Sequence, residues 1–75
     1  MANLLERIAI DSKVMTGKPV IRGTRITVEA ILERLFGGMT EAEICKEFSH
    51  ISPEDIKAAQ FYALEIVKSE DVLVS

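Results

Sequence analysis

Three helix starts constrain this fold more than any other feature of the sequence. At each start a residue that caps helices follows an apolar residue, and a second apolar residue comes five positions after the first. These sets are Ile26, Thr27 and Ile31; Met39, Thr40 and Ile44; and Ile51, Ser52 and Ile56. A capping oxygen satisfies a free backbone N–H of the first turn, and the apolar pair packs across the cap. The sequence therefore predicts three helices, each with a defined start.

The first predicted helix covers Val28–Phe36. Five apolar residues recur in it at helical spacing, and we expect them to form one apolar stripe. They are Val28, Ile31, Leu32, Leu35 and Phe36. The Gly37–Gly38 pair that follows favours a left-handed C-cap, which ends the helix.

The second and third predicted helices form a closely spaced pair. The second covers Glu41–Phe48, and Thr40 and Glu43 match the capping box at its start. The third runs from Pro53 to about Lys68. Ser52 is its expected cap, and two acidic residues follow Pro53 at the positive end of the helix dipole.

A short β segment is expected before the helices. Arg7–Asp11 alternates polar and apolar residues and predicts a strand, which Val20–Ile21 can pair with across the intervening loop. Gly17 and Gly23 allow turns with positive φ on either side of the second strand. An isolated hairpin is barely stable in water, so this one must pack on the helices or on a second chain.

The length of 75 residues predicts one domain, with a basic arm (1–27), three helices (28–68) and a tail (69–75). A chain of this size buries only ~60% of its unfolded surface. Its hydrophobic content is nevertheless 48%, so we expect a second chain to cover part of it in a homodimer. The lone Cys45 excludes a disulfide framework and fits the cytoplasm. The N-terminus does not match a signal peptide, and no stretch is long enough to span a membrane.

Charge divides unevenly along the chain. Residues 1–27 carry five Lys or Arg against two acids, a net +3, whereas residues 28–75 carry four against ten, a net −6. Such asymmetry is typical of interaction proteins, although ordinary surface charge explains it equally well.

No set of residues predicts catalysis. Gly17-Lys18 lacks the upstream glycine and the following Ser or Thr of a phosphate loop. His50 is the only histidine and has no partner at metal-ligand spacing. Cys45 lies on an apolar helix face and fits a buried structural thiol. We therefore expect a protein that is not an enzyme, with no catalytic residue, no metal site and no cofactor.

The helix pair has the spacing of a helix-turn-helix, with Ser49–Ser52 as the connection. In DNA-binding proteins of this kind the start of the last helix meets base edges. Here Glu54 and Asp55 stand at that start with the wrong charge for DNA. Lys57 and Gln60 lie further along and could contact it. Plain three-helix packing without DNA is the alternative.

Arg22 and Arg25, on either side of Gly23, have the best chemistry for nucleic acid, because arginine pairs bidentately with phosphate. Alternatively, they tie their loop to carboxylates of the helices. If they bind nucleic acid, we expect Arg22→Ala to weaken binding without unfolding the protein. The full set of candidate contacts for nucleic acid or a partner is Lys18, Arg22, Thr24, Arg25, Lys57 and Gln60.

One run of residues is specific enough to indicate a family. It reads Gly17-Lys18-Pro19-Val20-Ile21-Arg22-Gly23-Thr24-Arg25-Ile26-Thr27-Val28. Ile10-Asp11 precedes it, and a helix, Gly37-Gly38 and the capped helix pair follow. From about Arg7 to Val67 the chain resembles the small bacterial and archaeal domain-of-unknown-function family 433. Many members have Cys or Gly-Gly where this chain has Met15-Thr16, which argues against a thiol function there.

The resemblance implies a mainly α fold, namely a homeodomain-like three-helix helix-turn-helix bundle preceded by a short β segment. The family is regarded as antitoxin-like, and its members often occur beside genes for PIN-like nucleases, which they are thought to neutralise. No catalytic residues belong to its description.

We therefore expect a dimeric antitoxin-like protein of a type II toxin–antitoxin system that binds a PIN-like nuclease, with operator DNA as a further ligand. The acidic helices could occupy the cationic substrate groove of the nuclease. The main alternative is a self-associating interaction module without nucleic-acid binding. An accessory subunit of an enzyme is a third reading.

Overall fold

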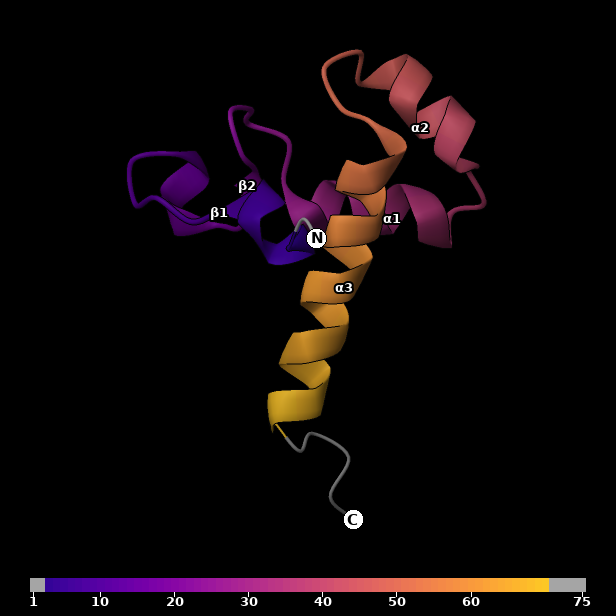
Figure 1. Cartoon of the computed structure of the whole chain (residues 1–75). Helices are drawn as coiled ribbons and strands as arrows, with labels where there is room; N and C mark the ends of the chain where they lie inside the picture. Colours follow the sequence, from indigo (N-terminus) through magenta and orange to yellow (C-terminus); the bar gives the residue numbers. More distant parts are fainter. Residues whose placement is uncertain (1–2, 71–75) are drawn as a thin grey trace.

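Three α-helices make up most of the computed structural model, which describes residues 3–70. They are α1 (Val28–Phe36), α2 (Glu41–Glu47) and α3 (Pro53–Glu70). The long α3 packs against both shorter helices, and its C-terminal half extends beyond the rest of the chain (Figure 1). Within residues 3–70, no helix is both long and apolar enough to cross a membrane.

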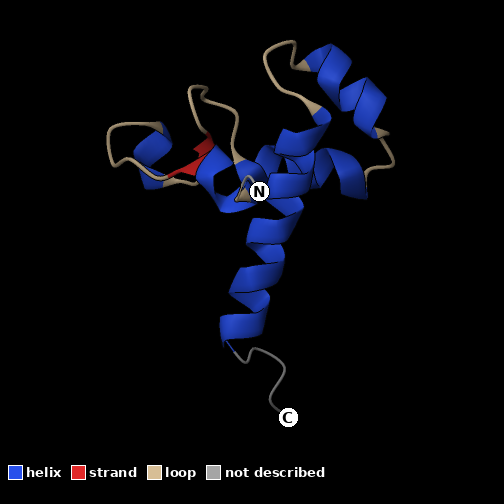
Figure 2. Cartoon of the chain, in the orientation of Figure 1, coloured by secondary structure: helices blue, strands red, loops and turns tan. Residues whose placement is uncertain are grey.

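The N-terminal part forms a small β-hairpin with two 3₁₀ turns, as the red strands and neighbouring blue turns of Figure 2 show. β1 (Ile8–Ala9) pairs antiparallel with β2 (Val20–Ile21), with Ile8 opposite Ile21. The first 3₁₀ turn, η1 (Leu4–Arg7), packs on α3, and the second, η2 (Met15–Gly17), lies in the hairpin loop. The prediction of a mainly helical fold after a short β segment is therefore confirmed.

The core lies where the hairpin meets all three helices. Ile31, Ile44 and Ile56 contribute one fully buried side chain from each helix. Ile8 and Ile21 join them from the two strands, so the hairpin and the helices share one core. Burial against the helices therefore stabilises a two-stranded hairpin that would be marginal alone.

Local capping explains why two of the helices begin where the sequence predicts. Thr27 Oγ1 accepts a hydrogen bond from Ala30 N at 2.9 Å. Thr40 Oγ1 accepts from Glu43 N at 3.2 Å, while the Glu43 carboxylate accepts from Thr40 N at 2.8 Å, which completes the capping box. Gly38 has a φ of +100° and ends α1 in the expected left-handed turn.

The start of α3 differs in its capping chemistry from the prediction. Ser52 was expected to cap the helix with its own oxygen, but its hydroxyl donates to Asp55 Oδ2 at 3.4 Å. The same carboxylate oxygen accepts from Ser52 N at 2.9 Å. Asp55, three residues after Ser52, therefore provides the side-chain acceptor at the start of α3.

Three predictions need correction. The first strand covers Ile8–Ala9 and not Arg7–Asp11, because Arg7 belongs to the preceding 3₁₀ turn. Phe48 is the C-cap of α2 and not its last helical residue. Phe36 does not join the buried stripe of α1: its side chain is 94% exposed, because no described element covers the end of this helix.

Candidate functional site

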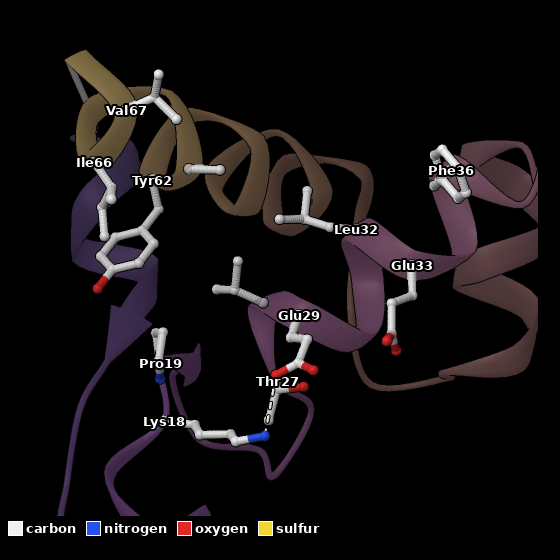
Figure 3. Close-up of a pocket in the computed structure, with 12 residues that line it drawn as sticks. Lys18, Pro19, Thr27, Glu29, Leu32, Glu33, Phe36, Tyr62, Ile66 and Val67 are labelled. Atoms are coloured by element: carbon white, nitrogen blue, oxygen red, sulfur yellow. Dashed lines mark hydrogen bonds and ion pairs between the residues drawn. The ribbon is translucent and has the colours of Figure 1, made fainter. Parts of the chain in front are cut away.

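The most prominent hollow of the described surface is an open apolar groove of ≈ 620 Å³ between α1 and the second half of α3. Val28 and Leu32 of α1 and Tyr62 and Ala63 of α3 form its apolar lining (Figure 3). These residues lie where α3 extends past the three-helix core and still faces α1. A pocket with an apolar lining and few polar groups favours an apolar ligand or a protein side chain.

Charged side chains line only one side of this groove. Glu29 and Glu33 of α1 lie along its edge, and Lys18 approaches from the hairpin to pair with Glu29 at 3.0 Å (Figure 3). Within residues 3–70, Glu33 has no ion pair. The groove therefore combines an apolar lining with a negative edge.

Exposed apolar side chains extend the groove in two directions. Phe36 lies at one end, almost fully exposed. Ile66 and Val67 line the α3 side, and the side chains are 39% and 52% exposed. A contiguous apolar surface of this kind is typical of interaction sites.

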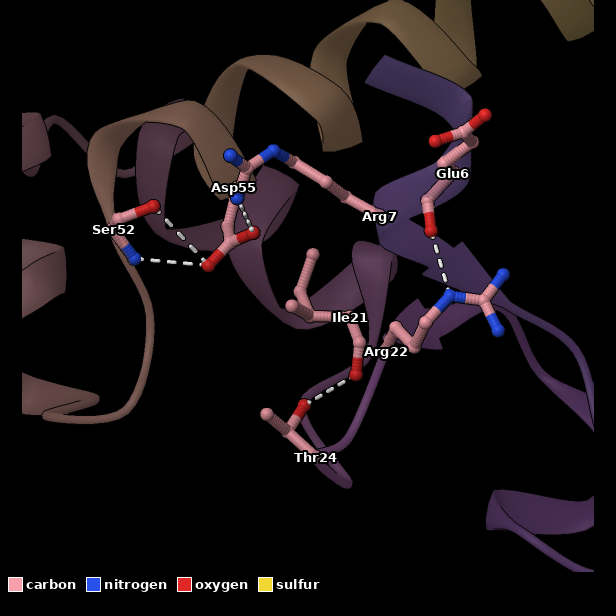
Figure 4. Close-up of polar contacts among 7 residues, drawn as sticks. All are labelled: Glu6, Arg7, Ile21, Arg22, Thr24, Ser52 and Asp55. Atoms are coloured by element: carbon pink, nitrogen blue, oxygen red, sulfur yellow. Dashed lines mark hydrogen bonds and ion pairs between the residues drawn. The ribbon is translucent and has the colours of Figure 1, made fainter. Parts of the chain in front are cut away.

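Arg22 is held by its own chain. Its Nε donates to the carbonyl oxygen of Glu6 at 2.6 Å (Figure 4). Its Nη2 donates to the carbonyl oxygen of Ile8 at 3.1 Å. Its backbone N–H also donates to Arg7 O at 2.7 Å, which continues the hairpin. The partners of its side chain are thus carbonyls of the N-terminal segment, whereas the sequence suggested phosphate or carboxylates of the helices.

Thr24 stabilises the turn that carries the two arginines. Its hydroxyl donates to Ile21 O at 2.8 Å (Figure 4). The same oxygen accepts from Ile26 N at 3.0 Å. Gly23, with a φ of +83°, supplies the left-handed backbone that this turn requires. Thr24 therefore has a clear structural use in shaping the loop.

Arg25 differs from Arg22, although the two stand only three positions apart. Its side chain is exposed, and within residues 3–70 it has no hydrogen bond and no ion pair. The ordered turn presents it to solvent. Arg25 is thus the candidate residue of this turn whose guanidinium remains available to a partner.

Lys57 and Gln60 lie on another side of the molecule. Lys57 Nζ is 3.8 Å from the Glu41 carboxylate of α2. Successive residues of a helix turn by ~100°, so Lys57 and Gln60 lie roughly 160° and 140° round α3 from Asp55, which faces the N-terminal segment. The structure therefore does not combine these two residues with Arg22 and Arg25 into one basic surface.

An ion pair that the sequence analysis missed connects the two halves of the chain. Arg7 Nη1 lies 3.0 Å from Asp55 Oδ1, and the Asp55 side chain is only 11% exposed (Figure 4). Arg7 follows no recognisable motif, and its partner comes 48 residues later, so no local signal could have revealed the contact.

Reactive side chains are few and separate. Within residues 3–70, no group of three or more His, Cys, Asp or Glu could hold a metal ion. Cys45 is partly buried against the core. Burial raises the pKa of its thiol, and the negative charges of Glu41, Asp55 and Glu54 act in the same direction. The thiol is therefore protonated at neutral pH and a poor nucleophile.

Comparisons with known proteins agree with the sequence run around Gly17–Val28. A family model described as "Protein of unknown function (DUF433)" matches residues 8–63. An uncharacterized protein of Archaeoglobus fulgidus is 69% identical over 26 residues, which make up 35% of this chain and 72% of that protein. No solved structure matches significantly.

Proposed function

Because the chain belongs to the DUF433 family of proteins of unknown function, we propose that it is a non-catalytic, antitoxin-like protein that binds a PIN-like nuclease. The family resemblance supplies the class of partner. The structure supports a role in binding through one observation above all: the apolar groove between α1 and α3, with Phe36 exposed at its end. This surface resembles the buried centre of a protein–protein interface, where aromatic residues are enriched.

The acidic helices support a cationic partner. Three of the cations on these helices are already paired with glutamates of the three-helix body. The pairs are Arg34 with Glu47, Lys57 with Glu41 and Lys68 with Glu65. Residues 28–75 carry a net charge of −6, and most of their cations are therefore engaged within the helices. A nuclease that binds RNA presents a positive groove, and an acidic body is complementary to it.

The homeodomain-like helix-turn-helix is part of the same proposal. α2 and α3 are joined by Phe48–Ser52, a connection short enough for this motif, and α1 precedes them. DNA is a second candidate ligand because Arg25 has a solvent-facing guanidinium on an ordered turn. Glu54 in the first turn of α3 opposes the usual insertion of that helix into DNA.

RNA cleavage by a PIN-like nuclease from the same genome tests the main proposal. We expect cleavage to stop when the chain is added at about one equivalent, because the bound protein covers the substrate groove. An unrelated acidic protein of similar size is the control for non-specific charge effects. Unchanged cleavage at a large excess of the chain would contradict the proposal.

Binding to the DNA upstream of the gene tests the second ligand. Phosphate contacts release counterions, so affinity must fall steeply as salt rises. We expect Arg25→Ala to reduce the slope of log affinity against log salt by ~1 for each Arg25 that contacts phosphate. If the chain does not bind this DNA even at low salt, DNA is eliminated as a ligand and the nuclease remains as the proposed partner.

A further inference from the structure

We propose that the groove between α1 and α3 is a self-association surface, into which the exposed C-terminal half of α3 from a second copy of this chain packs. This inference goes beyond the proposed function and gives the groove to a second copy of the chain, so that the acidic surfaces of the helices remain for the nuclease. It assigns an occupant to the apolar surface around Phe36.

The shape argument begins with α3, which contributes to the groove and also carries the side chains that could fill it. Ala63 and Val67 line the groove, and Leu64 lies beside Val67 on the outer face. Residues three and four positions apart are neighbours on a helix, so Val67 adjoins both Ala63 and Leu64 and the apolar surface continues from the groove toward the outer face. In a twofold arrangement the two copies of α3 run antiparallel, and this surface of each copy enters the groove of the other copy.

Charge complementarity favours a second copy over an unrelated helix. Lys68 follows Leu64 by one helical turn; its side chain is 65% exposed, and its contact with Glu65 of the same helix is long, at 3.5 Å. On the opposite side of the groove, Glu33 of α1 has no ion pair within residues 3–70 and lies toward the Phe36 end (Figure 3). An antiparallel α3 from a second copy directs its C-terminal turn toward that end. Lys68 of one copy then meets Glu33 of the other, and the symmetry repeats this pair.

Phe36 is the expected anchor of the contact. Its 94% exposed ring is costly to leave in water and is large enough to be a central contact of an interface. Because the ring touches so little of its own chain, a polar replacement should leave the fold unchanged. This property makes Phe36 suitable for a test in which loss of association is separate from loss of folding.

Sedimentation equilibrium of the full chain provides the first test. We expect a dimer for the unaltered protein, and Phe36→Gln should raise its dissociation constant about tenfold or more. Met15→Gln is the matched control, because Met15 is 41% exposed and lies in the hairpin loop, outside the groove. Far-UV circular dichroism should show the same helix content for all three proteins.

A charge exchange tests the arrangement of the two copies. Glu33→Lys alone places two lysines opposite each other, and Lys68→Glu alone places two glutamates opposite each other. Each variant should therefore be less dimeric than the unaltered chain. An equimolar mixture of the two restores both attractive pairs and should dimerise, which a partner other than this chain cannot reproduce.

Two results would overturn the inference. A chain that stays monomeric up to high micromolar concentration has no such surface, and nuclease binding through Phe36 would then assign the groove to the nuclease. A dimer that Phe36→Gln and Met15→Gln weaken equally, or not at all, associates through another face. Neither result affects the nuclease-inhibition assay, so the proposed function is tested separately.

Discussion

Arg7 and Asp55 form an ion pair with 3.0 Å between Nη1 and Oδ1, and this contact joins the N-terminal 3₁₀ turn to the first turn of α3. The other carboxylate oxygen of Asp55 accepts from Ser52 N, so one side chain both caps α3 and holds the N-terminal segment on it. The packing of η1 on α3 depends on this double use of Asp55.

Asp55→Ala should lower the free energy of unfolding by about 2 kcal/mol, because it removes a cap acceptor and leaves Arg7 without its partner. The partial exposure of Arg7 makes the loss smaller than that of a fully buried ion pair. Urea unfolding followed by circular dichroism measures it. Glu54→Ala, at the exposed neighbouring position, should change stability by no more than ~0.5 kcal/mol. Equal effects of the two substitutions would show that Asp55 has no special role.

Arg22→Ala should destabilise the protein by about 1–2 kcal/mol, because it removes the hydrogen bonds to the carbonyls of Glu6 and Ile8. The sequence predicts that the protein stays folded after this substitution, and the observed contacts add the expectation of a measurable loss of stability. Arg25→Ala is the control: its side chain makes no described contact, so the midpoint of thermal unfolding should not change. An unchanged midpoint for Arg22→Ala would mean that its carbonyl contacts add no stability.

Acid should weaken the contact between α1 and α2. Arg34 forms a two-point contact with the Glu47 carboxylate, at 3.2 Å from Nε to Oε1 and 3.0 Å from Nη2 to Oε2, and it lies 4.6 Å from the centre of the Phe48 ring. The hydrogen bond from Arg34 lowers the pKa of Glu47 below 4.5. A lowered folded-state pKa stabilises the protein above the unfolded-state value, and that stabilisation is lost as pH falls through the folded-state value.

Stability as a function of pH checks this relationship. Between neutral pH and pH values below 4.5, Glu47→Gln should lose less stability than the unaltered chain, because it lacks the carboxylate that becomes protonated. Glu54→Gln serves as a comparison, since Glu54 has no ion pair within residues 3–70. If Glu47→Gln retains the full acid sensitivity of the unaltered chain, this ion pair does not contribute to it.

Cys45 should react slowly with iodoacetamide at neutral pH, because burial raises the pKa of its thiol and little thiolate is present. The rate should be at least several-fold below that of a free cysteine and should increase in urea, which exposes the side chain. Mass spectrometry of the alkylated protein gives both rates. A native rate equal to that of free cysteine would contradict the partial burial against the core.

The helices were predictable because their signals are local. Thr27 and Thr40 lie within a few residues of the N–H groups that they cap, and the predicted α1 agrees with the structure at both ends. α3 continues to Glu70, slightly beyond its predicted end near Lys68. Of the predicted tail, residues 71–75 lie outside the described residues.

The contacts of the candidate site were less predictable because they depend on residues far apart in the chain. Arg22 resembles a phosphate ligand in sequence, but the hairpin places it against carbonyls that precede it by 14 and 16 residues. Phe36 has helical spacing with buried residues, yet nothing in the sequence shows that α3 leaves it uncovered. Met15 and Thr16 also have positive φ values, which the sequence could not signal because neither residue is a glycine.

The most direct test of the groove as a contact surface uses Tyr62. The chain has one tyrosine and no tryptophan, and Tyr62 lines the groove, so the intrinsic fluorescence comes from a side chain of this site. We predict that acrylamide quenching of Tyr62 weakens as protein concentration rises, and that Phe36→Gln abolishes this dependence. Equal quenching of the unaltered chain at every concentration, including those at which it is dimeric, would contradict the account.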